Sequence, residues 1–220
     1  MALAIIHTRA KSGIDAPPVA VEVHLSNGLP SLSIVGMPET AVKESKDRVR
    51  SALLNAHFDF PARRITVNLA PADLPKEGGR FDLAIALGIL AASEQIPSDT
   101  LNNYEVIGEL ALSGELRAVD GVLPTSLACA RAKRDLILPI KNADEASLAN
   151  NTGVYPANHL LTVCAHLNGN QPIAKHQCPS SPKHPPPTAD INEIIGQHQA
   201  KRALEIAAAG GHNLLISHPP

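Results

Sequence analysis

Aromatic residues are scarce in this chain of 220 residues, which has no tryptophan, two tyrosines and three phenylalanines. Apolar residues nevertheless make up 44% of the sequence, so we predict a real hydrophobic core built from aliphatic side chains. The shortage of aromatic rings also leaves little on which nucleic-acid bases could stack.

The sequence also lacks a surplus of one charge and a set of paired cysteines. Its formal net charge is −2 and its pI is near 6.5, so its overall composition carries no nucleic-acid-binding signature. Cys129, Cys164 and Cys178 show no CxxC spacing, which favours a reducing compartment over a disulfide framework. The ten histidines form no HxH or HExxH pair, and we predict no metal site.

Long apolar runs and common catalytic signatures are missing as well. No apolar stretch reaches the roughly 18 residues that a membrane span requires. The first residues do not show the basic segment and apolar run of a signal peptide. No Gly-x-Ser-x-Gly motif of a serine hydrolase occurs. We therefore expect a cytoplasmic protein without membrane contact.

The periodicity of the apolar residues predicts an α/β (α+β) fold for residues 1–169. Val19, Val21 and Val23 alternate with polar residues, as in a half-buried strand. The Asn27-Gly28 turn signal should pair this strand in a hairpin with one around residues 32–34. Further strands are expected at residues 4–10, 65–69, 104–110, 136–138 and 154–155, and helices at residues 38–56, 81–93, 121–132, 143–149 and 158–167.

Residues 170–189 differ in composition, because they contain six of the nineteen prolines and few large apolar residues. This segment should be an extended, solvated linker. His176, Cys178 and His184 share it, but an unpacked segment lacks the preorganisation of a metal site. A second domain should start at residue 190, with a helix to about residue 209 and a strand at residues 213–216.

The loop Pro75-Lys76-Glu77-Gly78-Gly79-Arg80 is the first candidate site. Adjacent glycines let the backbone approach a ligand closely, and Lys76 and Arg80 are able to hold an anion. A turn with solvated charges explains the same residues, so both interpretations stay open.

A locally basic region is the second candidate, because residues 43–80 contain eight Lys and Arg against five Asp and Glu. This excess is compatible with contacts to DNA or to a neighbouring subunit, or with a solvated, salt-bridged helix face. The candidate contacts are Lys43, Lys46, Arg50, Arg63, Arg64, Lys76 and Arg80.

Three long segments resemble a known family. They are residues 7–53 (HTRAKSGIDAPPVAVEVHLSNGLPSLSIVGMPETAVKESKDRVRSAL), residues 60–93 (FPARRITVNLAPADLPKEGGRFDLAIALGILAAS) and residues 108–124 (GELALSGELRAVDGVLP). They closely resemble the N-terminal region of the ComM/YifB proteins, which are bacterial magnesium-chelatase-like AAA+ ATPases. The resemblance implies a Lon-protease-like fold, similar also to the second domain of a small-subunit ribosomal protein.

The resemblance continues in residues 194–215 (IIGQHQAKRALEIAAAGGHNLL), which match the opening helix and first strand of the family's AAA+ module. A P-loop needs Gly-x-x-x-x-Gly-Lys-Ser/Thr, and its first glycine would fall at His218. We therefore expect an incomplete AAA+ βα stub, truncated before the Walker A loop. The resemblance implies partial nucleotide contacts at Ile195, Gly196, Pro219 and Pro220, no cofactor in this chain, and ATP with Mg²⁺ for a full-length parent.

The resemblance also implies a function. In the family, this region is the non-catalytic N-terminal domain of a hexameric, ATP-driven DNA motor that acts by branch migration in natural transformation and recombination. Arg80 stands where a Lon nucleophile would be and Leu123 near its lysine, and neither can act in that dyad. We thus expect no enzyme activity from this chain. The alternatives are a stand-alone DNA- or protein-binding module using the basic residues of 43–80, and a residual peptidase.

Overall fold

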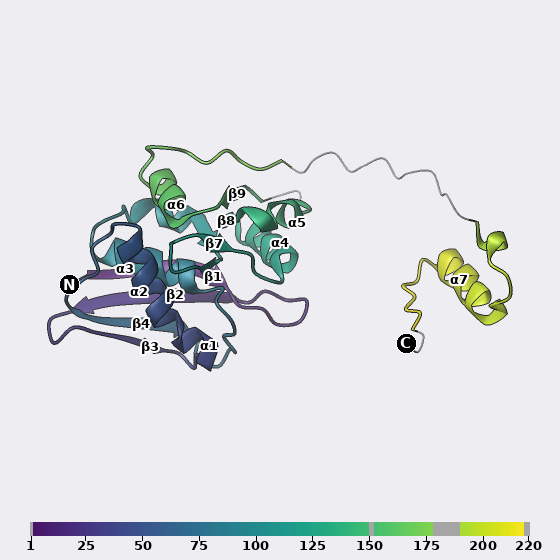
Figure 1. Cartoon of the computed structure of the whole chain (residues 1–220), viewed down its shortest axis with the longest axis horizontal. Coiled ribbons are helices and arrows are strands. Elements are labelled where there is room, and N and C mark those ends of the chain that lie inside the picture. Colours follow the sequence, from purple (N-terminus) through teal and green to yellow (C-terminus); the bar gives the residue numbers. More distant parts are fainter. Residues whose placement is uncertain (1, 150–151, 178–189, 218–220) are drawn as a thin grey trace. The chain divides into compact units, whose positions relative to one another are not determined.

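Seven strands form one mixed sheet in the computed structural model, which describes residues 2–149, 152–177 and 190–217 (Figure 1). The strand order is β3-β4-β2-β1-β5-β8-β9, with β1–β2 and β2–β4 antiparallel and the other pairs parallel. The strands are β1 (Ala2–Arg9), β2 (Pro18–Ser26), β3 (Ser31–Val35), β4 (Arg64–Ala70), β5 (Tyr104–Val106), β8 (Asp135–Pro139) and β9 (Val154–Ala157). A separate small sheet pairs β6 (Glu109–Leu110) with β7 (Leu116–Arg117). The predicted α/β class is confirmed.

The chain divides into two compact units, Met1–Cys178 and Pro179–Pro220. The helices of the first unit are α1 (Thr40–Lys43), α2 (Ser45–Asn55), α3 (Asp82–Ala92), α4 (Val122–Ala132), α5 (Ala143–Ser147) and α6 (Leu160–Leu167), with the 3-10 turns η1 (Asp99–Asn103) and η2 (Ile140–Asn142). No helix in the described part of the chain is long and apolar enough to cross a membrane.

The core of the first unit is centred on α3, whose residues are all buried. It packs against β1 and β2, and α2 lies on it in turn (Figure 1). Gly88 permits this close approach, because a Cβ at that position would lie 2.5 Å from Cγ2 of Val23. An apolar helix with no polar face therefore separates the sheet from an outer, amphipathic helix.

The predicted hairpin between β2 and β3 is wrong. β4 lies between these strands, antiparallel to β2 and parallel to β3, with α2 in the crossover. β4 pairs with β2 over seven positions. Its fully buried residues, Ile65, Val67 and Leu69, lie opposite buried residues of β2. The five residues of β3 have only one buried side chain, Ile34, so β4 is the better partner.

Two other predicted elements are interrupted. The helix expected at residues 38–56 is divided at Glu44 into α1 and α2, and Pro38 lies outside both. The strand expected at residues 104–110 ends at Val106, and β6 begins at Glu109. Between them, the N–H of Gly108 donates to the Arg80 carbonyl, and its own carbonyl accepts from Leu83. These bonds turn the chain towards the start of α3.

The segment after α6 is attached to the first unit through residue 177, although residues 170–189 were predicted to be solvated throughout. Ile173 packs against the core, and its N–H donates to His166 Nδ1 at 3.0 Å. The N–H of His176 donates to the Val154 carbonyl at 2.8 Å, and its ring nitrogen lies 2.8 Å from an oxygen of Asp144. Residues 178–189, with Cys178 and His184, lie outside the described residues.

The second unit contains the 3-10 turn η3 (Ile191–Glu193) and the helix α7 (His198–Gly210), which agrees with the predicted helix. The strand predicted at residues 213–216 is wrong, because these residues form no regular structure. Leu215 is 92% exposed. A strand needs a neighbour for its backbone N–H and C=O groups, and the described part of this unit has none.

Candidate functional site at the loop before helix α3

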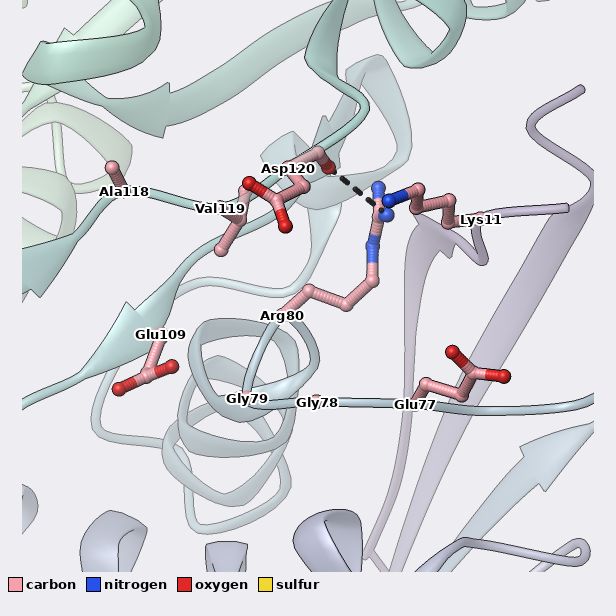
Figure 2. A pocket seen from close by; sticks show the side chains of 9 residues that line it. All are labelled: Lys11, Glu77, Gly78, Gly79, Arg80, Glu109, Ala118, Val119 and Asp120. Carbon is pink, nitrogen blue, oxygen red and sulfur yellow. Dashed lines mark hydrogen bonds between the residues drawn. The ribbon is translucent and has the colours of Figure 1, made fainter. Parts of the chain in front are cut away.

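The predicted loop of residues 75–80 forms one wall of a pocket of about 290 Å³ (Figure 2). The opposite wall comes from the segment between β7 and α4, and a third part comes from the loop after β1. The pocket is lined by Lys11, Glu77, Gly78, Gly79, Arg80, Glu109, Ala118, Val119 and Asp120.

Lys76 fastens this loop from the inside instead of facing a ligand. Its side chain is fully buried, and Nζ donates to the Pro71 carbonyl. The Lys76 carbonyl accepts from the N–H of Glu39 at 3.3 Å, which ties the loop to the start of α1. Burial lowers the pKa of Lys76 below its ordinary value of 10.5, against the opposing charge of Asp73.

Arg80 is also buried, with 6% of its surface exposed. One terminal nitrogen donates to the Asp120 carbonyl at 3.4 Å and the other to Thr125 Oγ1 on α4 at 3.0 Å. Its Nε is buried and has no acceptor among the described residues. Burial lowers the pKa of Arg80 below 12.5, opposed by the charge of Asp120, but an arginine remains protonated.

Two positions at the pocket favour glycine, because a charged side chain lies close to where a Cβ would be. A Cβ on Gly79 would lie 2.6 Å from Cγ of Glu109, so the glutamate side chain occupies that space. Gly121 has a φ of 67° and lies against the stem of Lys11, whose Cδ would be 3.3 Å from an added Cβ. Lys11 was missed in the sequence, because a lone exposed lysine in a distant loop carries no signal.

The three carboxylates of the pocket differ in their exposure. Glu77 and Asp120 are exposed, and Glu109 is half-buried with an oxygen 3.4 Å from Arg117. Within the described part of the chain, neither Lys11 nor Arg80 forms an ion pair with any of them. The pocket thus combines one buried cation, Arg80, and one exposed cation, Lys11, neither of them in an ion pair among the described residues, with three carboxylates.

Asp82 connects three elements next to the pocket, and the sequence analysis did not identify it. This fully buried first residue of α3 accepts from Ser45 Oγ, from Arg48 Nε at 2.8 Å and from the N–H of Leu110 at 3.3 Å. Burial raises the pKa of Asp82, while its bonds to Arg48 and Ser45 oppose the rise. These contacts join α2, α3 and β6, a structural role that accounts for a carboxylate inside the core.

The structure divides the predicted set of DNA or subunit contacts. Lys43, Arg50, Arg63 and Arg64 are exposed and Lys46 is half-buried. The Arg50 guanidinium lies 4.6 Å from the centre of the Phe60 ring. Lys76 and Arg80 are removed from this surface as a correction, because both side chains are buried by the loop that carries them.

The two segments compared with a Lon dyad do come together. Arg80 bonds to Asp120 and Thr125, which flank Leu123 in sequence. Leu123 lies in the first turn of α4, and its N–H donates to Glu145 at 3.1 Å. The residues that line the pocket include no Ser, Thr, Cys or His, so no side chain there can act as an ordinary acyl-transfer nucleophile.

The predicted nucleotide contacts fall in the second unit or outside the described residues. Ile195 is 97% exposed, and Gly196 has a φ of 72° just before α7. Pro219 and Pro220 lie outside the described residues. In the part of the chain that the structure describes, no group of three or more His, Cys, Asp or Glu side chains is placed to hold a metal ion.

Comparison with known proteins assigns the sequence that builds this pocket to a family. The family model described as subunit ChlI of Mg-chelatase matches residues 21–142, which include most of the pocket and all of α3. The chain belongs to the magnesium chelatase subunit ChlI family. A second model, described as magnesium chelatase, subunit ChlI, matches residues 190–220 of this ChlI-family chain.

Relatives of this ChlI-family chain align with it over its whole length. It is 55% identical to competence protein ComM of Haemophilus influenzae and 54% identical to YifB of Salmonella typhimurium. It is also 38% identical to an uncharacterized protein of Mycobacterium tuberculosis. The chain spans 44%, 43% and 44%, respectively, of the lengths of these three relatives. More than half of each relative therefore lies outside the region that aligns with this chain.

Proposed function

We propose that this chain supplies the N-terminal part of an ATP-driven motor that acts on DNA in natural transformation and recombination. The observation that carries the proposal is its 55% identity, over the whole chain, to a Haemophilus influenzae protein named as a competence protein. The motor, its branch-migration activity and its hexameric ring are the parts of this proposal that extend beyond family membership.

In this proposal the first unit is a non-catalytic domain with a Lon-like fold. The pocket that corresponds to a Lon site contains Arg80 and lacks an acyl-transfer nucleophile, which supports an attachment role over a residual peptidase. Residues 190–220 begin the nucleotide-binding module, in which Ile195, Gly196, Pro219 and Pro220 would supply part of the contacts to the nucleotide. The remainder of the parent protein would complete the site for ATP and Mg²⁺. The chain without that remainder should neither hydrolyse ATP nor cleave peptides.

A complementation experiment tests the motor proposal. A Haemophilus influenzae strain that lacks ComM would receive either the full-length gene that encodes this chain or the same gene without residues 1–178. Restored transformation by the full-length gene is the expected result. The shortened gene should fail although its product accumulates. Failure of a well-expressed full-length protein would contradict the proposal.

A second candidate function is direct DNA contact by the first unit. The exposed Lys43, Arg50, Arg63 and Arg64, with the half-buried Lys46, remain as a basic set after the two buried cations are removed. Contacts with DNA phosphates release counterions, so binding should weaken steeply as salt rises.

Fluorescence anisotropy with single-stranded and branched oligonucleotides over a salt series tests this candidate. The chain with all five residues changed to glutamine should lose binding and salt dependence. A control variant with three exposed cations outside this set, Arg131, Lys133 and Lys141, changed to glutamine should retain both. Undetectable binding by the unaltered chain would reject DNA contact and leave contact between subunits as the explanation for the surface.

A further inference from the structure

Two cations of the pocket meet at the same turn of the chain without a carboxylate between them. Arg80 donates to the carbonyl of Asp120, and the stem of Lys11 lies against the next residue, Gly121. Figure 2 shows the Lys11 ammonium and the Arg80 guanidinium directed to this turn. The Glu77 carboxylate lies apart from them, and the Glu109 carboxylate packs against Gly79 on the other side of the pocket. Two positive charges, one buried and one exposed, therefore lie together at this turn.

Arg80 differs in this respect from Arg9, which is also buried, and from the half-buried Arg48. Arg9 binds both carboxylate oxygens of Glu105, at 2.5 and 2.9 Å, and Arg48 binds the carboxylate of Asp82. The guanidinium of Arg80 bonds only to neutral oxygens, and its buried Nε has no acceptor in the described part of the chain. Burying an unpaired charge is costly, so an anion in the pocket would stabilise this arrangement.

The backbone of the loop adds hydrogen-bond donors to these charges. Gly78 has a φ of 68°, and α3 begins two residues after Arg80, at Asp82. None of the described residues accepts a hydrogen bond from the N–H of Gly78, Gly79 or Arg80. These three N–H groups precede α3, whose own first N–H groups donate to the carbonyls of Gly79 and Gly108, and they can donate to an anion in the pocket.

We propose that this pocket binds the phosphate group of a small molecule. A phosphate dianion matches the two unpaired cations in charge, and its oxygens can accept from the N–H groups of the glycine loop as well. The pocket volume of about 290 Å³ accommodates a phosphate group with a small substituent. The exposed Glu77 and Asp120 repel a polyanion, which favours a small ligand over the backbone of DNA.

Titration of the full chain with inorganic phosphate, followed by ¹⁵N NMR, tests the proposal. Sodium chloride at matched ionic strength serves as the reference. We expect saturable shifts of the amides of Gly78, Gly79 and Arg80. Lys11→Gln, an exposed change that preserves the fold, should weaken phosphate binding by at least about tenfold, the loss typical of one charge-assisted hydrogen bond. Lys141→Gln, another exposed lysine outside the pocket, should leave the affinity unchanged.

Arg80→Lys provides a second variant, because it keeps the positive charge and removes the planar fork, and it should also weaken binding. Absence of saturable shifts at these amides, or equal affinity in the Lys11→Gln protein, would overturn the proposal. A single-stranded oligonucleotide distinguishes the source of the phosphate. It should not displace inorganic phosphate from the loop, and displacement would overturn the assignment to a small molecule.

Discussion

Arg9 on β1 and Glu105 on β5 form a buried ion pair across 96 positions of sequence. The guanidinium Nε lies 2.5 Å from one carboxylate oxygen and the second nitrogen 2.9 Å from the other. Cys129 of α4 donates its thiol hydrogen to the same carboxylate at 3.2 Å, and Arg9 also binds the Ala16 carbonyl. The pair therefore connects the antiparallel and parallel halves of the sheet and attaches α4 to both.

Removing one member of this pair should destabilise the protein severely. Glu105→Gln leaves the Arg9 guanidinium buried without a counter-charge, and the free energy of unfolding should fall by about 3–5 kcal/mol. Urea unfolding monitored by circular dichroism measures the change. The pair of the exposed Arg117 and the half-buried Glu109 is the control, and Arg117→Gln should cost less than about 1 kcal/mol. Equal effects of the two changes would contradict the assigned role.

Gly88→Ala should be destabilising even though alanine is the better helix former. The new methyl group would lie 2.5 Å from Val23 Cγ2 in a packed interface. Overpacking of this kind costs about 1–3 kcal/mol, which exceeds the roughly 1 kcal/mol gained in helix propensity. Thermal unfolding of Gly88→Ala, Val23→Ala and the double variant measures the coupling. The double variant should be more stable than the sum of the single effects predicts.

Cys164 should make stability fall with pH in the alkaline range. Burial raises the pKa of its thiol from 9.0 to about 12. Because the folded-state pKa is raised, the contribution is complete below pH 9 and is lost as the unfolded thiol ionises above it. Between pH 9 and 11 the unfolding free energy should fall by about 1.4 kcal/mol per pH unit more in the unaltered protein than in Cys164→Ala. Parallel curves for the two proteins would contradict this prediction.

His166 should hold residues 171–177 in place above mildly acidic pH. Its Nδ1 accepts the N–H of Ile173, its Nε2 lies 3.1 Å from the Tyr104 hydroxyl, and its ring packs against Tyr155. Burial lowers the pKa of His166 below 6.5, so this stabilisation is present above pH 6.5 and is lost as the pH falls through the folded-state value.

His166→Leu tests this attachment at neutral pH. Loss of the acceptor should expose the segment, and trypsin should cleave after Lys175 several-fold faster than in the unaltered chain. His159→Leu is the matched control, because His159 caps the start of α6 and, among the described residues, bonds to Leu161 and Ser113 and not to residues 171–177. An unchanged cleavage rate in His166→Leu would show that the packing of Ile173 is sufficient on its own.

The sequence predicted most elements of the first unit because their signals are local. Alternating valines in β2 and a continuous apolar run in α3 each reflect burial of contiguous residues. The pairing of β3 failed because strand choice is a competition among segments far apart, which β4 wins through its buried residues. The strand expected at residues 213–216 failed for a related reason, since its neighbours are absent from the described residues.

Within the candidate site, local pattern was sufficient for the family, the α/β class and the glycine loop at residues 75–80, because each is a property of adjacent residues. Packing alone decided which charges face outwards. Packing buries Lys76 and Arg80 and brings Lys11 to the pocket. It also pairs Arg9 and Arg48 with carboxylates, whereas Arg80 has no such partner among the described residues. Burial and partnership of a charge depend on residues that meet only in the folded chain, and for that reason no local motif contains them.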